Sequence, residues 1–184
     1  PVVSDRIPHQ PDGGGVVLHR RDRQEVRAGF ERIVAQAWQA DLADSVQGVL
    51  GQPDVQEGIE AVVGVTHDPQ FGPLIMFGLG GAYVELVRDV VFRLHPLTEH
   101  DIETMIRSVR ASQLLDGYRG APPGDEGAVR DLLARVSQMV EDVPELQEMD
   151  LNPVKILPPG EGNLALDARV RQNRPAGPLE CRPR

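Results

Sequence analysis

Cysteine, aromatic residues and long apolar runs are all scarce in this chain of 184 residues, and each scarcity excludes a class of protein. The single cysteine, Cys181, lies in a segment rich in proline and arginine, so the sequence offers neither a disulfide framework nor a thiolate metal site. Aromatic residues make up 4% of the chain and the formal net charge is −9, which argues against a nucleic-acid partner. No apolar run is long enough to span a membrane and no signal peptide opens the sequence, so we expect a cytoplasmic protein without a membrane partner.

The spacing of apolar residues predicts a mixture of helices and strands. Helical spacing covers residues 22–38, 98–109 and 129–140, and the first two helices begin with capping boxes, Asp22 with Glu25 and Thr98 with Asp101. In the first helix, the residues expected on one inward-facing stripe are Val26, Phe30, Ile33, Val34 and Ala37. Strands are predicted at residues 46–52, 61–66, 73–77, 149–157 and 163–170. Residues 82–94 fit either a helical turn followed by a strand or one long strand. Strands and helices do not alternate strictly, so we predict the α+β class, with an antiparallel meander in the middle of the chain.

A cluster of glycines follows the apolar run Leu74 to Phe77, in the stretch FGPLIMFGLGGAYVE. Gly78, Gly80 and Gly81 indicate positive φ angles or a close approach of another group to the backbone. One interpretation is a tight turn between two core elements. The other is a cradle whose backbone N–H groups bind a phosphate or phosphoryl group. The stretch by itself does not decide between them.

The last predicted hairpin brings three polar residues together. If residues 158–161 form its turn, Asn152 lies directly opposite Asp167, and opposed residues share one sheet face. Asp150 comes two residues before Asn152 and is expected on the same face. Such hard oxygen donors suit Mg²⁺, which takes one or two protein oxygens together with substrate phosphates. The alternative interpretation is a polar, solvated face. Val154 and Ala165 are expected on the same face, and these apolar residues weaken that interpretation.

Other candidates carry less information on their own. His9 lies in a loop before three glycines, and a lone loop histidine is usually solvated. The sequence has no Gly-x-Ser-x-Gly elbow and no Walker loop, so neither a hydrolase triad nor a P-loop is expected.

Taken together, four segments resemble one known family. They read IPHQPDGGGVVL, GVLGQPDVQEGIEAVVGVTHDPQFGPLIMFGLGGAYVE, DVVFRLHPLTEHD and MDLNPVKIL…LALDARV. They are similar to the ATP-grasp domain of NDP-forming acyl-CoA synthetases of the ADP-forming acetate–CoA ligase type, relatives of the succinyl-CoA synthetase β-subunit. The resemblance implies an N-terminally truncated ATP-grasp fold: a remnant of the first lobe at residues 1–45, the second lobe at 46–171, and a disordered tail at 172–184.

The resemblance also implies a chemistry and a set of site residues. ATP phosphorylates a histidine of a partner CoA-ligase domain or subunit, the phosphoryl group passes to an acid, and CoA, bound by the partner, captures the acyl group. Mg²⁺ is the implied cofactor, and the glycine cluster becomes a phosphoryl-site loop. By position, the implied residues are His9 (second phosphoryl carrier), Asp150 (beside the phosphohistidine), Gln52 and Glu60 (nucleotide), Gly78, Gly80 and Gly81 (phosphoryl-site loop), and Asn152 and Asp167 (metal).

Several residues depart from the family pattern. Gln10 stands where a lysine is usual, and the chain begins at Pro1, about where the strand with the phosphate-binding lysine is expected. Lys155 is the only lysine in the sequence, and Asp54 replaces an apolar residue near the expected adenine position. Two hypotheses therefore stay open: part of an acyl-CoA synthetase, and a non-catalytic remnant that binds a partner.

Overall fold

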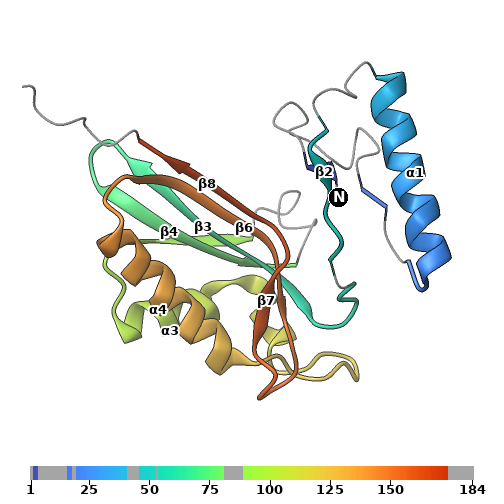
Figure 1. The fold of residues 1–184 in the computed structure, drawn as a ribbon. Coiled ribbons are helices and arrows are strands. Elements are labelled where there is room, and N and C mark those ends of the chain that lie inside the picture. Colours follow the sequence, from blue (N-terminus) through green and yellow to red (C-terminus); the bar gives the residue numbers. More distant parts are fainter. Residues whose placement is uncertain are drawn as a thin grey trace, which may run out of the picture. The chain divides into compact units, whose positions relative to one another are not determined.

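The computed structural model describes residues 2–3, 16–17, 20–40, 46–52, 54–80 and 89–173 (Figure 1). The chain forms two compact units, Pro1–Gln56 and Glu57–Arg184, which are described separately below. The sequence predicted a lobe boundary between residues 45 and 46, and the assignment of either unit to an ATP-grasp lobe stays a prediction.

The first unit contains one helix and a short strand pair. Helix α1 spans Arg23–Gln39, and the side chain of its N-cap, Asp22, accepts a hydrogen bond from the backbone N–H of Glu25 (2.8 Å), as the sequence predicted. Strand β1 (Val2–Val3) pairs antiparallel with β2 (Gly48–Val49), so the strand predicted at residues 46–52 is much shorter than expected.

The buried stripe of α1 differs from the predicted one. Its buried residues are Gly29, Ile33 and Ala37, whereas Val26 and Phe30, which we expected to face inward, are about half exposed. A Cβ on Gly29 would lie 3.4 Å from Cγ1 of Val17, which is close to an ordinary van der Waals distance. A neighbouring chain segment therefore approaches the helix along the glycine side.

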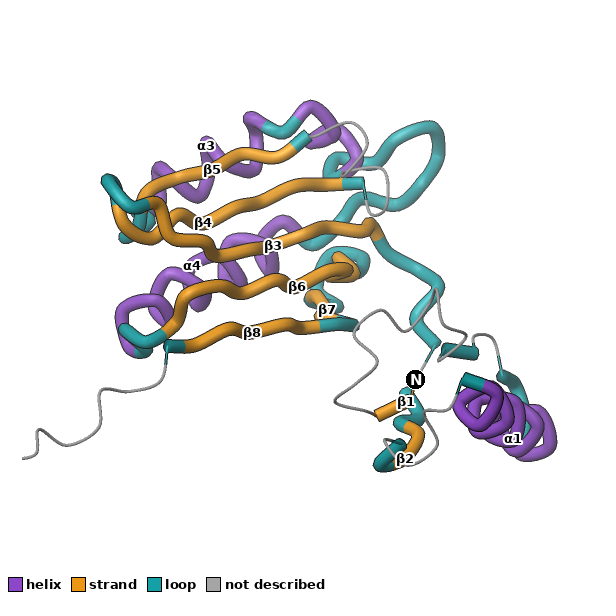
Figure 2. The backbone as a smooth tube through the Cα atoms, turned by 90° about the horizontal axis from the view of Figure 1, so that it is seen from above, coloured by secondary structure: helices purple, strands orange, loops and turns teal. Residues whose placement is uncertain are grey.

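The second unit is built on an antiparallel sheet (Figure 2). The strands run in the order β5-β4-β3-β6, and both β7 and β8 pair with β6, along different parts of its length. Their bounds are β3 Ile59–Asp68, β4 Gly72–Leu79, β5 Val90–Leu94, β6 Leu146–Ile156, β7 Asn163–Ala165 and β8 Ala168–Gln172. The meander predicted from the strands at 46–52, 61–66 and 73–77 is confirmed only for its last two strands, β3 and β4. The segment at 46–52 pairs with β1 in the first unit, and β5 is the third strand of the meander. Residues 82–88, where the sequence allowed two interpretations, lie outside the described residues, and the strand begins at Val90.

Two helices pack against one face of this sheet (Figures 1 and 2). They are α3 (Glu99–Ser108) and α4 (Glu126–Asp142), and a 3₁₀ helix, η2 (Arg110–Leu114), follows α3. The predicted capping box of α3 is confirmed, with Thr98 and Asp101 each accepting from the other's backbone N–H. The core between sheet and helices includes Val63, Ile75, Phe77, Met105 and Leu133. The side chains that alternate with these strand residues point to the opposite face of the sheet.

The register predicted for the last hairpin is confirmed. Val154 lies opposite Ala165 and Leu151 opposite Ala168, so the two intervening pairs are Asn152 with Asp167 and Pro153 with Leu166. The backbone N–H of Asn152 donates to the carbonyl of Asp167 (3.3 Å). The predicted strand 163–170 is nevertheless divided into β7 and β8, because Pro153, on the opposing strand, has no N–H to donate.

A β-bulge in β6 overturns one predicted face assignment. Ala61 of β3 pairs with Val154 and Val63 pairs with Leu151, so β6 carries one extra residue at Asn152-Pro153. Val154 consequently faces the helices, while Asp150, opposite Gly64, points to the other face. Val154 therefore does not share a face with Asp150, and it is no evidence against a solvated polar face there.

The C-terminal tail begins slightly later than predicted. Strand β8 continues to Gln172, and the backbone N–H of Asn173 donates to the carbonyl of Glu145 (2.9 Å). Residues 174–184 lie outside the described residues.

Candidate functional site

One row of side chains crosses the sheet on the face away from α3 and α4. Phe92, Met76, Gly64, Asp150 and Arg169 lie directly opposite one another on β5, β4, β3, β6 and β8. Because residues on either side of Gly64, such as those at positions 63 and 65, belong to the core, the row belongs to the opposite face. Segments distant in the sequence thus contribute to one continuous surface.

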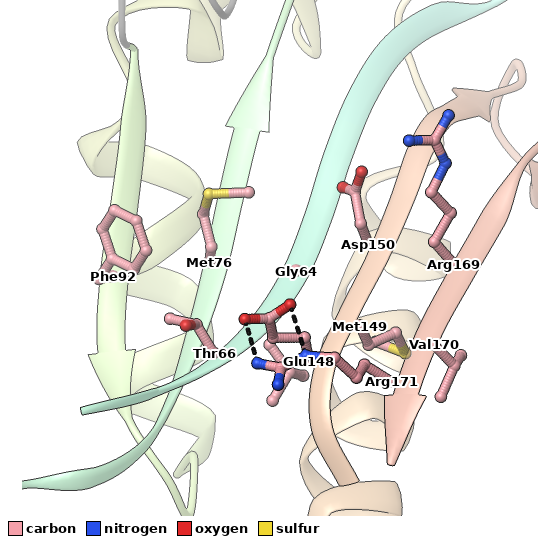
Figure 3. A pocket seen from close by; sticks show the side chains of 11 residues that line it. Gly64, Thr66, Met76, Phe92, Glu148, Met149, Asp150, Arg169, Val170 and Arg171 are labelled. Atoms are coloured by element: carbon pink, nitrogen blue, oxygen red, sulfur yellow. Dashed lines mark hydrogen bonds and ion pairs between the residues drawn. The ribbon is translucent and has the colours of Figure 1, made fainter. Parts of the chain in front are cut away.

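This row lines a groove of about 390 Å³ (Figure 3). Gly64 forms its floor, where a Cβ would lie 3.0 Å from Cε of Met76 and 3.3 Å from the carbonyl oxygen of Met149. Met76 and Phe92 line one side of the groove, whereas Asp150 and Arg169 line the other (Figure 3). The groove is therefore apolar along β4 and β5 and charged along β6 and β8.

A second charged pair lies on the same side of the groove. Glu148 and Arg171 face each other in the β6–β8 register, and Nε of Arg171 donates to Oε2 of Glu148 (3.0 Å) while Nη2 donates to Oε1 (Figure 3). The hydrogen bonds from Arg171 lower the pKa of Glu148, and those accepted by Glu148 raise the pKa of Arg171. This arginine is committed to a bidentate ion pair.

The predicted metal ligands lie next to this row. Asn152 is partly buried, and Asp167, whose side chain is 57% exposed, accepts a hydrogen bond from the backbone N–H of Ala168 through Oδ1 (2.9 Å). Its Oδ2 lies 3.9 Å from Nε of Arg169. The register therefore puts Asn152 opposite Asp167 and Asp150 opposite Arg169, with the pair Leu151 and Ala168 between them.

The donor set fits Mg²⁺ rather than a metal that needs a complete protein cage. In the described part of the chain, no group of three or more His, Cys, Asp or Glu side chains converges as a metal site. Mg²⁺ requires fewer protein ligands, since it keeps several waters and binds one or two protein oxygens together with phosphates. An amide oxygen from Asn152 and a carboxylate from Asp167 match that requirement, and their role as ligands stays a prediction.

The glycines at the end of β4 have specific backbone reasons. A Cβ on Gly78 would lie 2.9 Å from the carbonyl oxygen of Asp89 and from Cγ1 of Val90, so no larger residue fits. Gly80 has φ +121°, and its N–H donates to the carbonyl of Glu60 (2.8 Å). Close packing and positive φ thus account for these two glycines. Gly81 lies outside the described residues, and the phosphoryl-site role of the loop stays a prediction.

Glu60 has a partner that the sequence did not reveal. Nζ of Lys155 lies 3.0 Å from Oε1 of Glu60, and the two residues are directly opposite each other on β3 and β6. Lys155 is buried, whereas Glu60 is partly exposed. The predicted nucleotide residue therefore also holds the charge of a buried lysine.

The other predicted site residues belong to the first unit. Gln52 is exposed. Asp54 is exposed as well, so its carboxylate does not carry the cost of burial, and it accepts a hydrogen bond from Nε2 of Gln56 (3.2 Å). His9 lies outside the described residues. Arg169, which lines the groove, was not among the predicted site residues, although alternation along a strand puts it on the same face as Asp167.

Among the residues that the structure describes, no helix is both long and apolar enough to cross a bilayer. This agrees with the scarcity of long apolar runs in the sequence.

Comparison with known proteins gives extensive matches. The family described as ATP-grasp domain matches residues 1–171. The beta subunit of acetate–CoA ligase [ADP-forming] II from Pyrococcus furiosus is 41% identical over 170 residues, which cover 92% of this chain and 72% of that subunit. Acetate–CoA ligase [ADP-forming] I from Archaeoglobus fulgidus is 45% identical over 159 residues, but these cover only 23% of that longer protein.

Solved structures show the same likeness. Dinucleotide-forming acetyl-coenzyme A synthetase 1 of Ca. Korarchaeum cryptofilum, in complex with coenzyme A, Ca-AMPCP and HgCl⁺, is similar with a TM-score of 0.86 and 41% identity, covering 94% of this chain and 74% of that one. A second structure of that protein holds coenzyme A and Mg-AMPPCP, with its phosphohistidine segment pointing towards the nucleotide-binding site (TM-score 0.81, 41% identity, 94% of this chain, 76% of that one).

Proposed function

Because the chain belongs to the ATP-grasp family of ADP-forming acyl-CoA ligases, we propose that it binds Mg-nucleotide and transfers a phosphoryl group toward a histidine of a CoA-binding partner. The observation that carries this proposal is the pairing of Asn152 with Asp167 beside an open groove, in a chain so similar to those ligases. The relatives include separate beta subunits, which supports a second, CoA-binding subunit or domain as the partner.

The reaction proceeds by displacement at phosphorus. The bond between the β- and γ-phosphates of ATP breaks, a P–N bond to the partner's imidazole forms, and ADP leaves. A carboxylate oxygen of the acid then attacks the phosphorus, which gives an acyl phosphate and restores the histidine. The CoA thiol finally displaces phosphate to form the thioester. Each step requires positioning and charge neutralisation more than covalent help from the protein.

The predicted site residues have distinct tasks in this scheme. Asn152 and Asp167 would hold Mg²⁺, which when bound neutralises phosphate charge. Asp150 accepts a hydrogen bond from one imidazole N–H, so that the other ring nitrogen directs its lone pair at phosphorus. The phosphoryl-site loop of Gly78, Gly80 and Gly81 lies against the phosphoryl group, with the N–H of Gly80 itself donating to the carbonyl of Glu60. Glu60 and Gln52 contact the nucleoside part. His9 serves as a second phosphoryl carrier.

A second function is favoured by one observation. Lys155, the only lysine of the sequence, is buried against Glu60, so this chain offers no further lysine to the nucleotide's phosphates. In this second function the chain would act as a non-catalytic lobe that binds a partner without turnover.

Reconstitution distinguishes the two functions. ADP release is measured with acetate, CoA and Mg-ATP, for the chain alone and after addition of a CoA-binding partner subunit. The proposal predicts no turnover by the chain alone, turnover with the partner, and loss of that turnover in Asp167→Asn. A chain that binds the partner but neither binds Mg-nucleotide nor releases ADP supports the non-catalytic function.

A further inference from the structure

We propose that Arg169 is a further binding residue for the phosphoryl group that is transferred at this site. The inference rests on the proposed function and goes beyond it, since it adds a protein cation to the magnesium pair. Its ligand is a phosphoryl group, carried either as the γ-phosphate of the nucleotide or on a partner's imidazole.

The position of Arg169 is the first argument. It lies directly opposite Asp150 and two residues after Asp167 on the same side of the hairpin, since its Nε comes within 3.9 Å of Oδ2 of Asp167. It also lines the groove beside Asp150 (Figure 3). A phosphoryl group held between Asn152, Asp167 and Asp150 would therefore lie beside this guanidinium.

The availability of its N–H donors is the second argument. A separation of 3.9 Å is an ion-pair contact and not a hydrogen bond, and the Arg169 side chain is 59% exposed. Two other cations of the same face are committed more closely: Arg171 donates two hydrogen bonds to Glu148, and Lys155 lies 3.0 Å from Glu60. Arg169 thus keeps donors that a ligand can take.

Charge balance is the third argument. Asp150 and Asp167 are both acidic and flank the expected phosphoryl position, and each repels a phosphoryl group. A carboxylate of Asp167 that ligates a metal also attracts Arg169 less strongly, which leaves the guanidinium for phosphoryl oxygens. Arginine suits this task because its planar fork can donate two parallel hydrogen bonds to phosphate.

The test uses the full chain labelled with ¹⁵N and follows the Nε–Hε resonances of Arg169 and Arg171. One arm titrates phosphoimidazole with Mg²⁺, and the other compares a non-hydrolysable Mg-ATP analogue with Mg-ADP. We expect the Arg169 resonance, and not that of Arg171, to move in at least one arm. In that arm Arg169→Gln raises the Kd about tenfold, as for loss of a hydrogen bond to a charged group, whereas Arg171→Gln, the matched control, leaves it unchanged.

The arms identify the source of the phosphoryl group. If Arg169→Gln weakens binding of the ATP analogue and leaves the affinity for ADP unchanged, the phosphoryl group is the γ-phosphate of the nucleotide. If the substitution weakens binding of phosphoimidazole, the phosphoryl group is the one carried on the partner's imidazole. If Mg-nucleotide does not bind but Arg169 responds to phosphoimidazole, the nucleotide part of the proposed function fails and this inference stands. An unmoved Arg169 resonance in every arm, or equal effects of the two substitutions, overturns the inference even where Mg-ADP binds normally.

Discussion

Lys155 and Glu60 lie opposite each other on β6 and β3, with Nζ of the lysine 3.0 Å from Oε1 of the glutamate. The lysine is 8% exposed, whereas the glutamate side chain is 40% exposed. The buried cation therefore relies on a carboxylate that solvent and a ligand can reach. Any change at Glu60 acts on folding as well as on ligand binding.

Glu60→Ala is expected to lower the free energy of unfolding by about 2 kcal/mol, less than for a fully buried pair because Glu60 is partly exposed. The reason is the buried charge of Lys155, which loses its partner. Urea denaturation measures the change. In the Lys155→Met background the same Glu60→Ala substitution should cost little, because no buried charge remains. Equal costs in the two backgrounds would show that the pair does not stabilise the fold.

Two glycines of the sheet should respond differently to alanine. Gly78→Ala brings a Cβ to 2.9 Å from the backbone carbonyl of Asp89, which cannot move aside freely. We expect it to destabilise the second unit by about 1–3 kcal/mol.

Gly64→Ala is the matched comparison, since its nearest neighbour at 3.0 Å is the flexible end of Met76. The loss of unfolding free energy should be smaller for Gly64→Ala than for Gly78→Ala, and the added methyl group should fill part of the groove above its floor. Thermal unfolding of both variants measures the difference, and a larger loss for Gly64→Ala than for Gly78→Ala would contradict the packing described at the two positions.

Asp125 provides a prediction about pH. Its carboxylate accepts hydrogen bonds from the backbone N–H groups of Ala128, Gly160 and Gly162, and these bonds lower its pKa from the usual value. A pKa lowered in the folded state stabilises the protein above the ordinary aspartate pKa of about 3.9, and that stabilisation disappears as the pH falls through the lower, folded value.

Asp125→Asn should therefore be less stable than the unsubstituted chain at pH 6, and the difference should stay constant down to about pH 4 and shrink as the pH falls further. Chemical denaturation across this pH range measures it. Asp131→Asn, on the exposed face of α4, serves as the control. A difference that stays constant below about pH 4 as well would mean that the carboxylate charge of Asp125 plays no part in holding the 158–162 turn against α4.

Local signals in the sequence predicted much of this fold. Asp22 and Thr98 marked the helix starts because an N-cap acts through its own neighbours. The turn at residues 158–161 fixed the opposition of Asn152 and Asp167, since register in a hairpin follows from its turn.

Contacts between distant segments could not be predicted in this way. The bulge at Asn152-Pro153 appears only against β3, and counting along the hairpin alone misplaced Val154. The partner of Glu60 was hidden for the same reason, because Lys155 is distant in the sequence and only the β3–β6 pairing brings it near. The roles of the site residues came from family resemblance, with the metal pair alone also indicated by geometry.

The central claim is that Asn152 and Asp167 are the magnesium ligands, and paramagnetic broadening tests this claim most directly. Mn²⁺ with ADP replaces the magnesium complex on the ¹⁵N-labelled chain, and the backbone amide signals are compared with those of Asp167→Asn. The substitution keeps an oxygen that can accept from Ala168 N–H, so folding should be preserved. We predict that broadening is strongest at Leu151, Asn152, Asp167 and Ala168, and that Asp167→Asn removes it while Asp131→Asn does not. Broadening centred elsewhere, or unchanged in Asp167→Asn, would contradict the assignment of Asn152 and Asp167 as the magnesium ligands.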